Sequence, residues 1–153
     1  MKRLFKLLLL CAGLFVAWVV WNFGLPHRYE SREPMTRAQA QKKTGIHLPA
    51  SASNVYVATY RHWIMYTHCI RFTAPLTDCT GLAQLIAQRN GTGITDIPNA
   101  NIPTIQLIGF KTGVSWFNVG QIQEGLYVSP AGSFTGECWI DSKESRFYCL
   151  ITD

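Results

Sequence analysis

Residues 133–152, SFTGECWIDSKESRFYCLIT, decide the fold class, because they read as two strands around a four-residue turn. A turn at 142–145 places Asp141 opposite Arg146, as an ion pair, and Cys138 opposite Cys149. A disulfide between these two cysteines is sterically possible where the Cα atoms of opposite residues approach to about 4.5 Å. The stretch therefore predicts an antiparallel hairpin with a Cys138–Cys149 bridge.

The chain before this hairpin predicts three more strands and one helix. Residues 125–129 precede a Pro-Ala-Gly turn and extend the hairpin into a meander. Runs at 54–60 and 66–73, rich in aromatic and β-branched residues, predict a second hairpin. A helix capped by Thr77 or Asp78 has apolar residues at helical spacing and ends before Asn90-Gly91. The expected fold is α+β, with about five antiparallel strands and one packed helix.

The N-terminal segment predicts a membrane anchor within residues 1–25. Residues 7–25, LLLLCAGLFVAWVVWNFGL, carry no charge, and as a helix they cover roughly 28 Å, close to the hydrocarbon thickness of a bilayer. Bulky Trp18 and Trp21 stand where a signal peptidase needs small residues, so cleavage is not expected. Lipid attachment at Cys11 is the weaker alternative, because Leu10 is too large for the residue before a lipidated cysteine.

Residues 26–45 are expected to form a juxtamembrane spacer that is partly helical, and residues 46–153 the α+β domain. Helix formers follow Glu33, Pro34 and Met35, and Gly45 can end the helix. The spacer is either solvated or in contact with anionic lipid headgroups through its basic residues.

Charge and cysteine content indicate the compartment. The net charge is +5, but residues 44–153 hold six basic and seven acidic residues, which argues against a nucleic-acid surface. Four cysteines follow Cys11, and an even number in a small domain is typical of an oxidising compartment. We therefore expect the domain outside the cytoplasmic (inner) membrane, in a periplasm if the source has one, with Cys69 and Cys79 as the second disulfide.

Candidate catalytic and metal-binding groups are few. His62, His68, Cys69 and Cys79 lack the C-x-x-C or H-x-x-x-H spacing of a zinc site, so no metal is predicted. Cys79 near a helix start could act as a nucleophile with His68 as base, whereas a disulfide explains the same cysteine more simply. No cofactor motif is present, and the sequence predicts no enzyme.

Aromatic residues in expected connections are the candidate partner-binding group. Trp63 lies in the first hairpin loop, and Trp116 and Phe117 precede the meander. Tryptophan is enriched where proteins meet partners, so these residues predict a contact surface. The alternative is that the same rings fill the core.

Several short patterns resemble those of small bacterial envelope proteins that have an N-terminal lipid or helix anchor and no assigned activity. They are TGIHLP and ASNV at 44–49 and 52–55, IRFTAP at 70–75, CWID at 138–141 and the closing FY at 147–148. The resemblance implies an α+β domain outside the membrane, and it assigns no functional residue.

Together these observations predict a single-pass envelope protein whose non-enzymatic domain binds a protein or another envelope component, or is structural. An immunity or inhibitor protein is a narrower form of this hypothesis. A small periplasmic enzyme or redox protein that uses Cys79 or His68 is the alternative.

Overall fold

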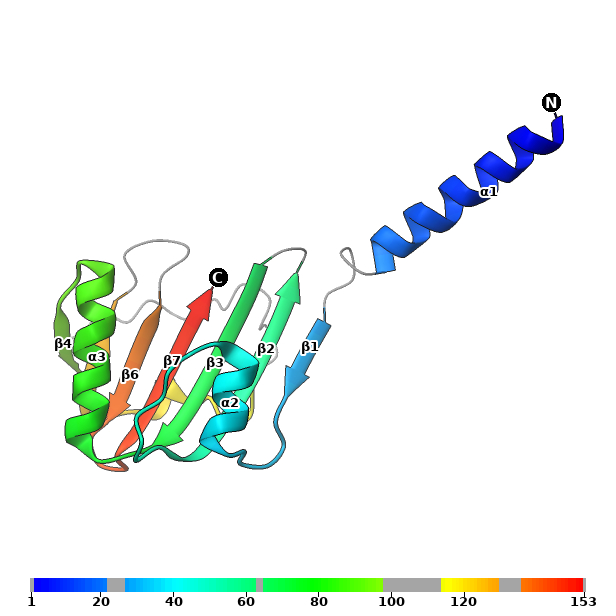
Figure 1. Ribbon diagram of the computed structural model, residues 1–153. Helices are drawn as coiled ribbons and strands as arrows, with labels where there is room; N and C mark the ends of the chain where they lie inside the picture. The colour runs from blue at the N-terminus through cyan, green and yellow to red at the C-terminus, as the bar shows by residue number, and fades with distance from the viewer. Residues whose placement is uncertain (1, 22–26, 63–64, 98–113, 130–135, 153) are drawn as a thin grey trace.

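The computed structural model describes residues 2–21, 27–62, 65–97, 114–129 and 136–152. These residues form one seven-stranded antiparallel sheet with two helices on one of its faces and a third helix beyond it (Figure 1). The predicted α+β class is therefore confirmed. The elements are α1 (Lys2–Val19), β1 (His27–Glu30), α2 (Arg37–Thr44), β2 (Ser53–His62), β3 (Met65–Thr73), α3 (Leu76–Asn90), β4 (Ile94–Ile97), η2 (Val119–Gln121), β5 (Gly125–Val128), β6 (Glu137–Asp141) and β7 (Arg146–Thr152).

The strand order is β1-β2-β3-β7-β6-β5-β4. The predicted hairpin is β2–β3 and the predicted meander is β5–β6–β7, and the final hairpin has the predicted register, with Cys138 opposite Cys149 and Asp141 opposite Arg146. Antiparallel pairing of β3 with β7 joins the two units, so that Arg71 lies opposite Tyr148.

Two edge strands were not predicted. β1 pairs with β2, and β4 pairs with β5. Each has four residues, and β1 reads His-Arg-Tyr-Glu, without an apolar alternation. Such short segments become strands because an existing sheet edge offers hydrogen bonds to them.

Residues 26–45, predicted as a partly helical spacer, contain the helix α2, but β1 and α2 also pack with the rest of the domain. β1 belongs to the sheet, and α2 buries Ala40 completely in the main core. Thr36 forms a capping box with Gln39, and Gly45 ends α2 with a φ of 70°, as the sequence predicted for Gly45. The helix packs because one small residue, Ala40, allows its backbone to approach the sheet.

The main core lies between the sheet and the two helices. α3 contributes Cys79 and Ala83, and the strands contribute Phe72 and Phe147, whose rings stack at 4.9 Å. α3 ends at Gly91 as predicted, but Pro75 occupies its N-cap and makes no side-chain cap bond, so the predicted Thr77 or Asp78 cap is wrong. Pro75 takes this place because its fixed φ suits the start of a helix.

The opposite face of the sheet, called the far face below, carries a second core. Residues 114–122, which include η2, cover it with Trp116, Phe117, Val119 and Ile122. They pack on Trp139 of β6 and Tyr148 of β7. Both faces of the central strands are therefore buried, which explains why Cys69 and Ile70, neighbours on β3, are both inaccessible.

α1 projects away from the sheet (Figure 1). Seven of its large apolar side chains are exposed, from 57% for Trp18 to 64% for Leu14 and Phe15. No helix within the described segments is both long and apolar enough to cross a membrane. The predicted span of residues 7–25 includes positions 22–25, which lie outside those segments.

Candidate functional site

A polar groove of about 460 Å³ lies on the far face of the sheet and is the candidate site. We call it the Arg71 groove. Its lining comes from β3, β6, β7, the turn between β6 and β7, and the segment 115–124. The lining residues are Arg71, Ser115, Trp116, Asn118, Gln121, Ile122, Gln123, Glu124, Asp141, Lys143, Glu144, Arg146 and Tyr148.

Strand alternation places Arg71 in this groove. Ile70 and Phe72 point to the main core, so Arg71 between them points to the far face. Its neighbours in register are Tyr56 on β2 and Tyr148 on β7. A charged residue thus stands in the middle of an otherwise largely apolar strand, between two tyrosines.

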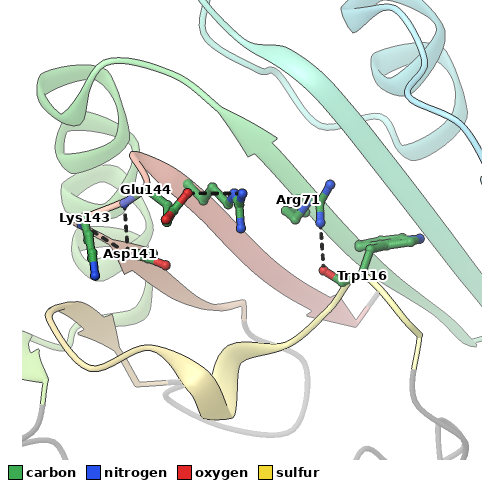
Figure 2. Close-up of polar contacts among 6 residues, drawn as sticks. Arg71, Trp116, Asp141, Lys143 and Glu144 are labelled. Atoms are coloured by element: carbon green, nitrogen blue, oxygen red, sulfur yellow. Dashed lines mark hydrogen bonds and ion pairs between the residues drawn. The ribbon is translucent and has the colours of Figure 1, made fainter.

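Aromatic rings and one backbone oxygen fix the half-buried Arg71 side chain. Its guanidinium carbon lies 4.2 Å from the centre of the Tyr56 ring and 6.0 Å from that of Trp116. Its Nη1 donates a hydrogen bond of 3.3 Å to the Trp116 carbonyl (Figure 2). Tyr56 and Trp116 also contact each other, with ring centres 5.6 Å apart. Cation–π contacts and one hydrogen bond thus hold the guanidinium beside these two rings.

Most of the hydrogen-bonding capacity of Arg71 is unused within the described part of the chain. A guanidinium has five N–H donors, and the Trp116 carbonyl takes one of them. No carboxylate of the described residues forms an ion pair with Arg71. Arg71 therefore presents a fixed positive charge with free donors to the groove.

The acidic residues of the turn are engaged elsewhere. Asp141 Oδ1 accepts hydrogen bonds of 3.1 Å from the backbone N–H groups of Lys143 and Glu144 (Figure 2). Glu144 Oε2 lies 3.2 Å from Arg146 Nη2. The predicted Asp141–Arg146 ion pair is wrong although the register is right, because the tight turn offers two N–H donors closer to the Asp141 carboxylate.

Two of the three predicted partner-binding aromatics, Trp116 and Phe117, belong to the second core. Trp116 and Phe117 are buried, and Phe117 makes edge contacts with Trp139 and Tyr148 at 5.9 and 5.7 Å. Trp63 lies outside the described residues. Trp116 and Phe117 therefore fill the core, as the alternative interpretation predicted, and cover the apolar far face of the sheet. The backbone of Trp116 also lines the groove.

The cysteines are free thiols in this structure. Cys138 and Cys149 are directly opposite on the main-core face, as predicted, but carry no bond. Cys79 lies in the main core, whereas Cys69 points to the far face. The predicted Cys69–Cys79 disulfide is wrong for this fold, because the sheet separates the two side chains.

The thiol chemistry of the alternative hypothesis finds little support. Burial, together with the nearby Asp78 carboxylate, raises the pKa of Cys79 to about 11. Burial raises the pKa of Cys69 to about 12. Both groups are therefore thiols rather than nucleophilic thiolates at neutral pH. His68 is 5% exposed, and its Nδ1 lies 3.1 Å from Thr59 Oγ1. Among the described residues no three histidine, cysteine or acidic groups are placed to hold a metal ion.

A second hollow, of about 480 Å³, lies beside β1 and α2. Two of its charged groups, Lys43 and Glu30, have partners: Lys43 Nζ lies 3.4 Å from the centre of the Tyr29 ring. Glu30 forms an ion pair of 2.9 Å with Arg28. We therefore give the Arg71 groove priority.

No family model matches the chain, and no curated protein or solved structure matches it at a significant level. The resemblance to anchored envelope proteins stays a prediction.

Arg71 was not predicted as a site residue. The available signal was a lone arginine inside the strand run Tyr66–Thr73. The far face, to which Arg71 points, is covered in the structure, and a half-buried charge with no acidic partner among the described residues is unusual enough to suggest a ligand.

Proposed function

We propose that this protein is a single-pass, membrane-anchored envelope protein whose domain binds a protein or another envelope component and catalyses no reaction. The binding site is the Arg71 groove. The observation that carries the proposal is the Arg71 guanidinium itself, fixed by Tyr56 and Trp116 and facing a polar hollow. Fixed donors in a concave polar site are suited to recognition.

The composition and exposure of α1 support the anchor. Exposed apolar side chains follow three basic residues near the N-terminus, and Trp18 and Trp21 lie at the far end of the apolar run. Apolar surface of this extent needs a cover, and a bilayer provides one. The proposal places the domain outside the cytoplasmic (inner) membrane.

The side chains of the groove support binding rather than catalysis. Asn118, Gln121 and Gln123 offer amide donors and acceptors, and the acids Asp141 and Glu144 are already hydrogen-bonded or paired. Amides bind polar groups without moving protons, which suits a recognition surface. A narrower form of the proposal is an immunity or inhibitor protein that takes up part of an enzyme toxin in this groove.

Site-specific photo-crosslinking in cells tests the binding site. A benzophenone side chain at Gln121, exposed in the groove, is expected to give a discrete crosslinked species. The matched control is Gln84, exposed on α3 on the other face of the sheet. The species should disappear when Arg71→Ala is added. Equal crosslinking at Gln84, or no effect of Arg71→Ala, would contradict the proposal.

Membrane extraction tests the anchor separately. The doubly substituted L10D/L14D chain should be released by alkaline carbonate, because each charge in the bilayer interior costs about 3 kcal/mol. Leu85→Asp, at an exposed leucine of α3, is the control and should stay in the membrane. Retention of the double variant would exclude residues 7–25 as the anchor.

A further inference from the structure

We propose that the Arg71 groove binds a carboxylate group of a peptide, with Arg71 as the residue that receives it. The inference rests on the proposed function, because it names the chemical group by which the partner is held. The carboxylate is that of an acidic side chain or of a chain terminus, and the two sources share this chemistry.

The first step of the argument is the charge balance at Arg71. The guanidinium is half-buried and permanently charged, and the described residues give it one hydrogen bond and no acid. A charge in this setting gains most from an anion that brings acceptors for the remaining donors. The ligand therefore carries negative charge at the point that meets Arg71.

The second step is the shape of the donor. Tyr56 and Trp116 lie within cation–π distance of the guanidinium. The guanidinium is itself a planar fork of donors, and these contacts restrict its movement. Two parallel N–H groups match the two oxygens of a carboxylate, which is the geometry of bidentate arginine–carboxylate pairs.

The third step is the rest of the lining. Asn118, Gln121 and Gln123 can hydrogen-bond the peptide groups beside the carboxylate. Arg146 lies on the same face of the neighbouring strand, one position diagonal to Arg71. Glu124, Asp141 and Glu144 also line the groove, so its charges balance and it suits a singly charged carboxylate better than a phosphate dianion.

The test is a titration of the full-length, ¹⁵N-labelled chain in detergent micelles, observed at the Arg71 Nε–Hε signal. N-acetylglycine carries a terminal carboxylate, N-acetylaspartyl amide carries a side-chain carboxylate, and N-acetylglycinamide carries neither. We expect a saturable shift with one or both acids and none with the amide. Inorganic phosphate is the competing anion, and tighter binding of phosphate would overturn the proposal.

Substitutions locate the effect. Arg71→Gln should weaken binding of the acids about tenfold or more, because it removes the charge-assisted hydrogen bonds, and Arg71→Lys should give a smaller loss. Because these two variants lack the Arg71 Nε–Hε group, their binding is followed through the backbone amide signals of the groove residues. Arg89→Gln, an exposed arginine on α3, is the matched control and should leave binding unchanged. Wild-type binding in Arg71→Gln, or an equal response to N-acetylglycinamide, would overturn the inference.

The outcome can be separated from that of the proposed function. Crosslinking at Gln121 without any response to carboxylates would leave the groove as a partner site and refute the carboxylate. Carboxylate binding without a crosslinked partner would support this inference and refute the proposed partner.

Discussion

The guanidinium carbon of Arg71 lies 4.2 Å from the centre of the Tyr56 ring, a contact between neighbouring strands β3 and β2 beneath the cover of the far face. Trp116, which belongs to that cover, contacts both residues. Cation–π contacts of this kind are worth about 0.5–2 kcal/mol, depending on how far the charge is desolvated. The same three residues that hold the cover in place therefore also orient the charge of the groove.

Tyr56→Leu is expected to lower the affinity for N-acetylglycine about two- to fivefold, because the ring no longer holds the guanidinium in one plane. The same variant should broaden or shift the Arg71 Nε–Hε signal in the free protein. Tyr29→Leu, which removes a ring on β1 away from the groove, is the control. Unchanged affinity in Tyr56→Leu would show that the ring does not position Arg71.

Two glycine substitutions should change the free energy of unfolding in opposite directions. A Cβ at Gly125 would collide with the carbonyl oxygen of Ile140, so Gly125→Ala must displace β5 from β6 and should cost about 1–3 kcal/mol. Gly81 lies inside α3 with no neighbouring atom in the way, and Gly81→Ala should add about 0.5–1 kcal/mol. Urea unfolding of the full chain in micelles measures both. A stabilised Gly125→Ala variant would contradict the predicted packing of β5.

Glu137→Gln should make stability less dependent on pH. Burial raises the pKa of Glu137 above its usual value, although the hydrogen bond from the Tyr127 hydroxyl, 3.1 Å long, acts in the opposite direction. The folded state thus binds a proton more tightly than the unfolded state, and stability falls as the pH rises from about 4.3 through the raised pKa.

Glutamine keeps an acceptor for Tyr127 and has no charge to bury. The gain in stability of Glu137→Gln over the native chain should therefore be larger at pH 8 than at pH 4 in urea unfolding. Glu33→Gln, at an exposed glutamate, controls for the loss of one charge. A pH-independent difference for Glu137→Gln would refute this account.

Thiol labelling distinguishes the cysteines. In protein taken from its native membrane, with Cys11 replaced by serine, denaturation without reductant should expose two reactive thiols, Cys69 and Cys79. Cys138 and Cys149, opposite each other on one face, are expected to be joined if the domain lies in an oxidising compartment. Four reactive thiols would refute that location. In the native state Cys69 and Cys79 should resist iodoacetamide, because burial raises the pKa of each thiol and excludes the reagent.

Local patterns in the sequence were sufficient for the elements whose ends are set by their own residues. Gly45 and Gly91 end two helices in the left-handed conformation, which glycine adopts without strain. The four-residue turn at 142–145 sets the register from Cys138 to Cys149. The lone arginine in β3 was visible in the sequence as well, but its meaning depended on whether that face was covered.

The sequence by itself determined the α+β class, the two hairpin units and the positions of α2 and α3, because each depends on capping, alternation or turn chemistry within about twenty residues. Only the tertiary structure decided that β3 pairs with β7, that β1 and β4 become edge strands, and that residues 114–122 cover the far face. These features depend on contacts between segments far apart in the chain. The same long-range packing separates Cys69 from Cys79 and encloses Arg71 among aromatic rings, and it therefore decides the candidate site.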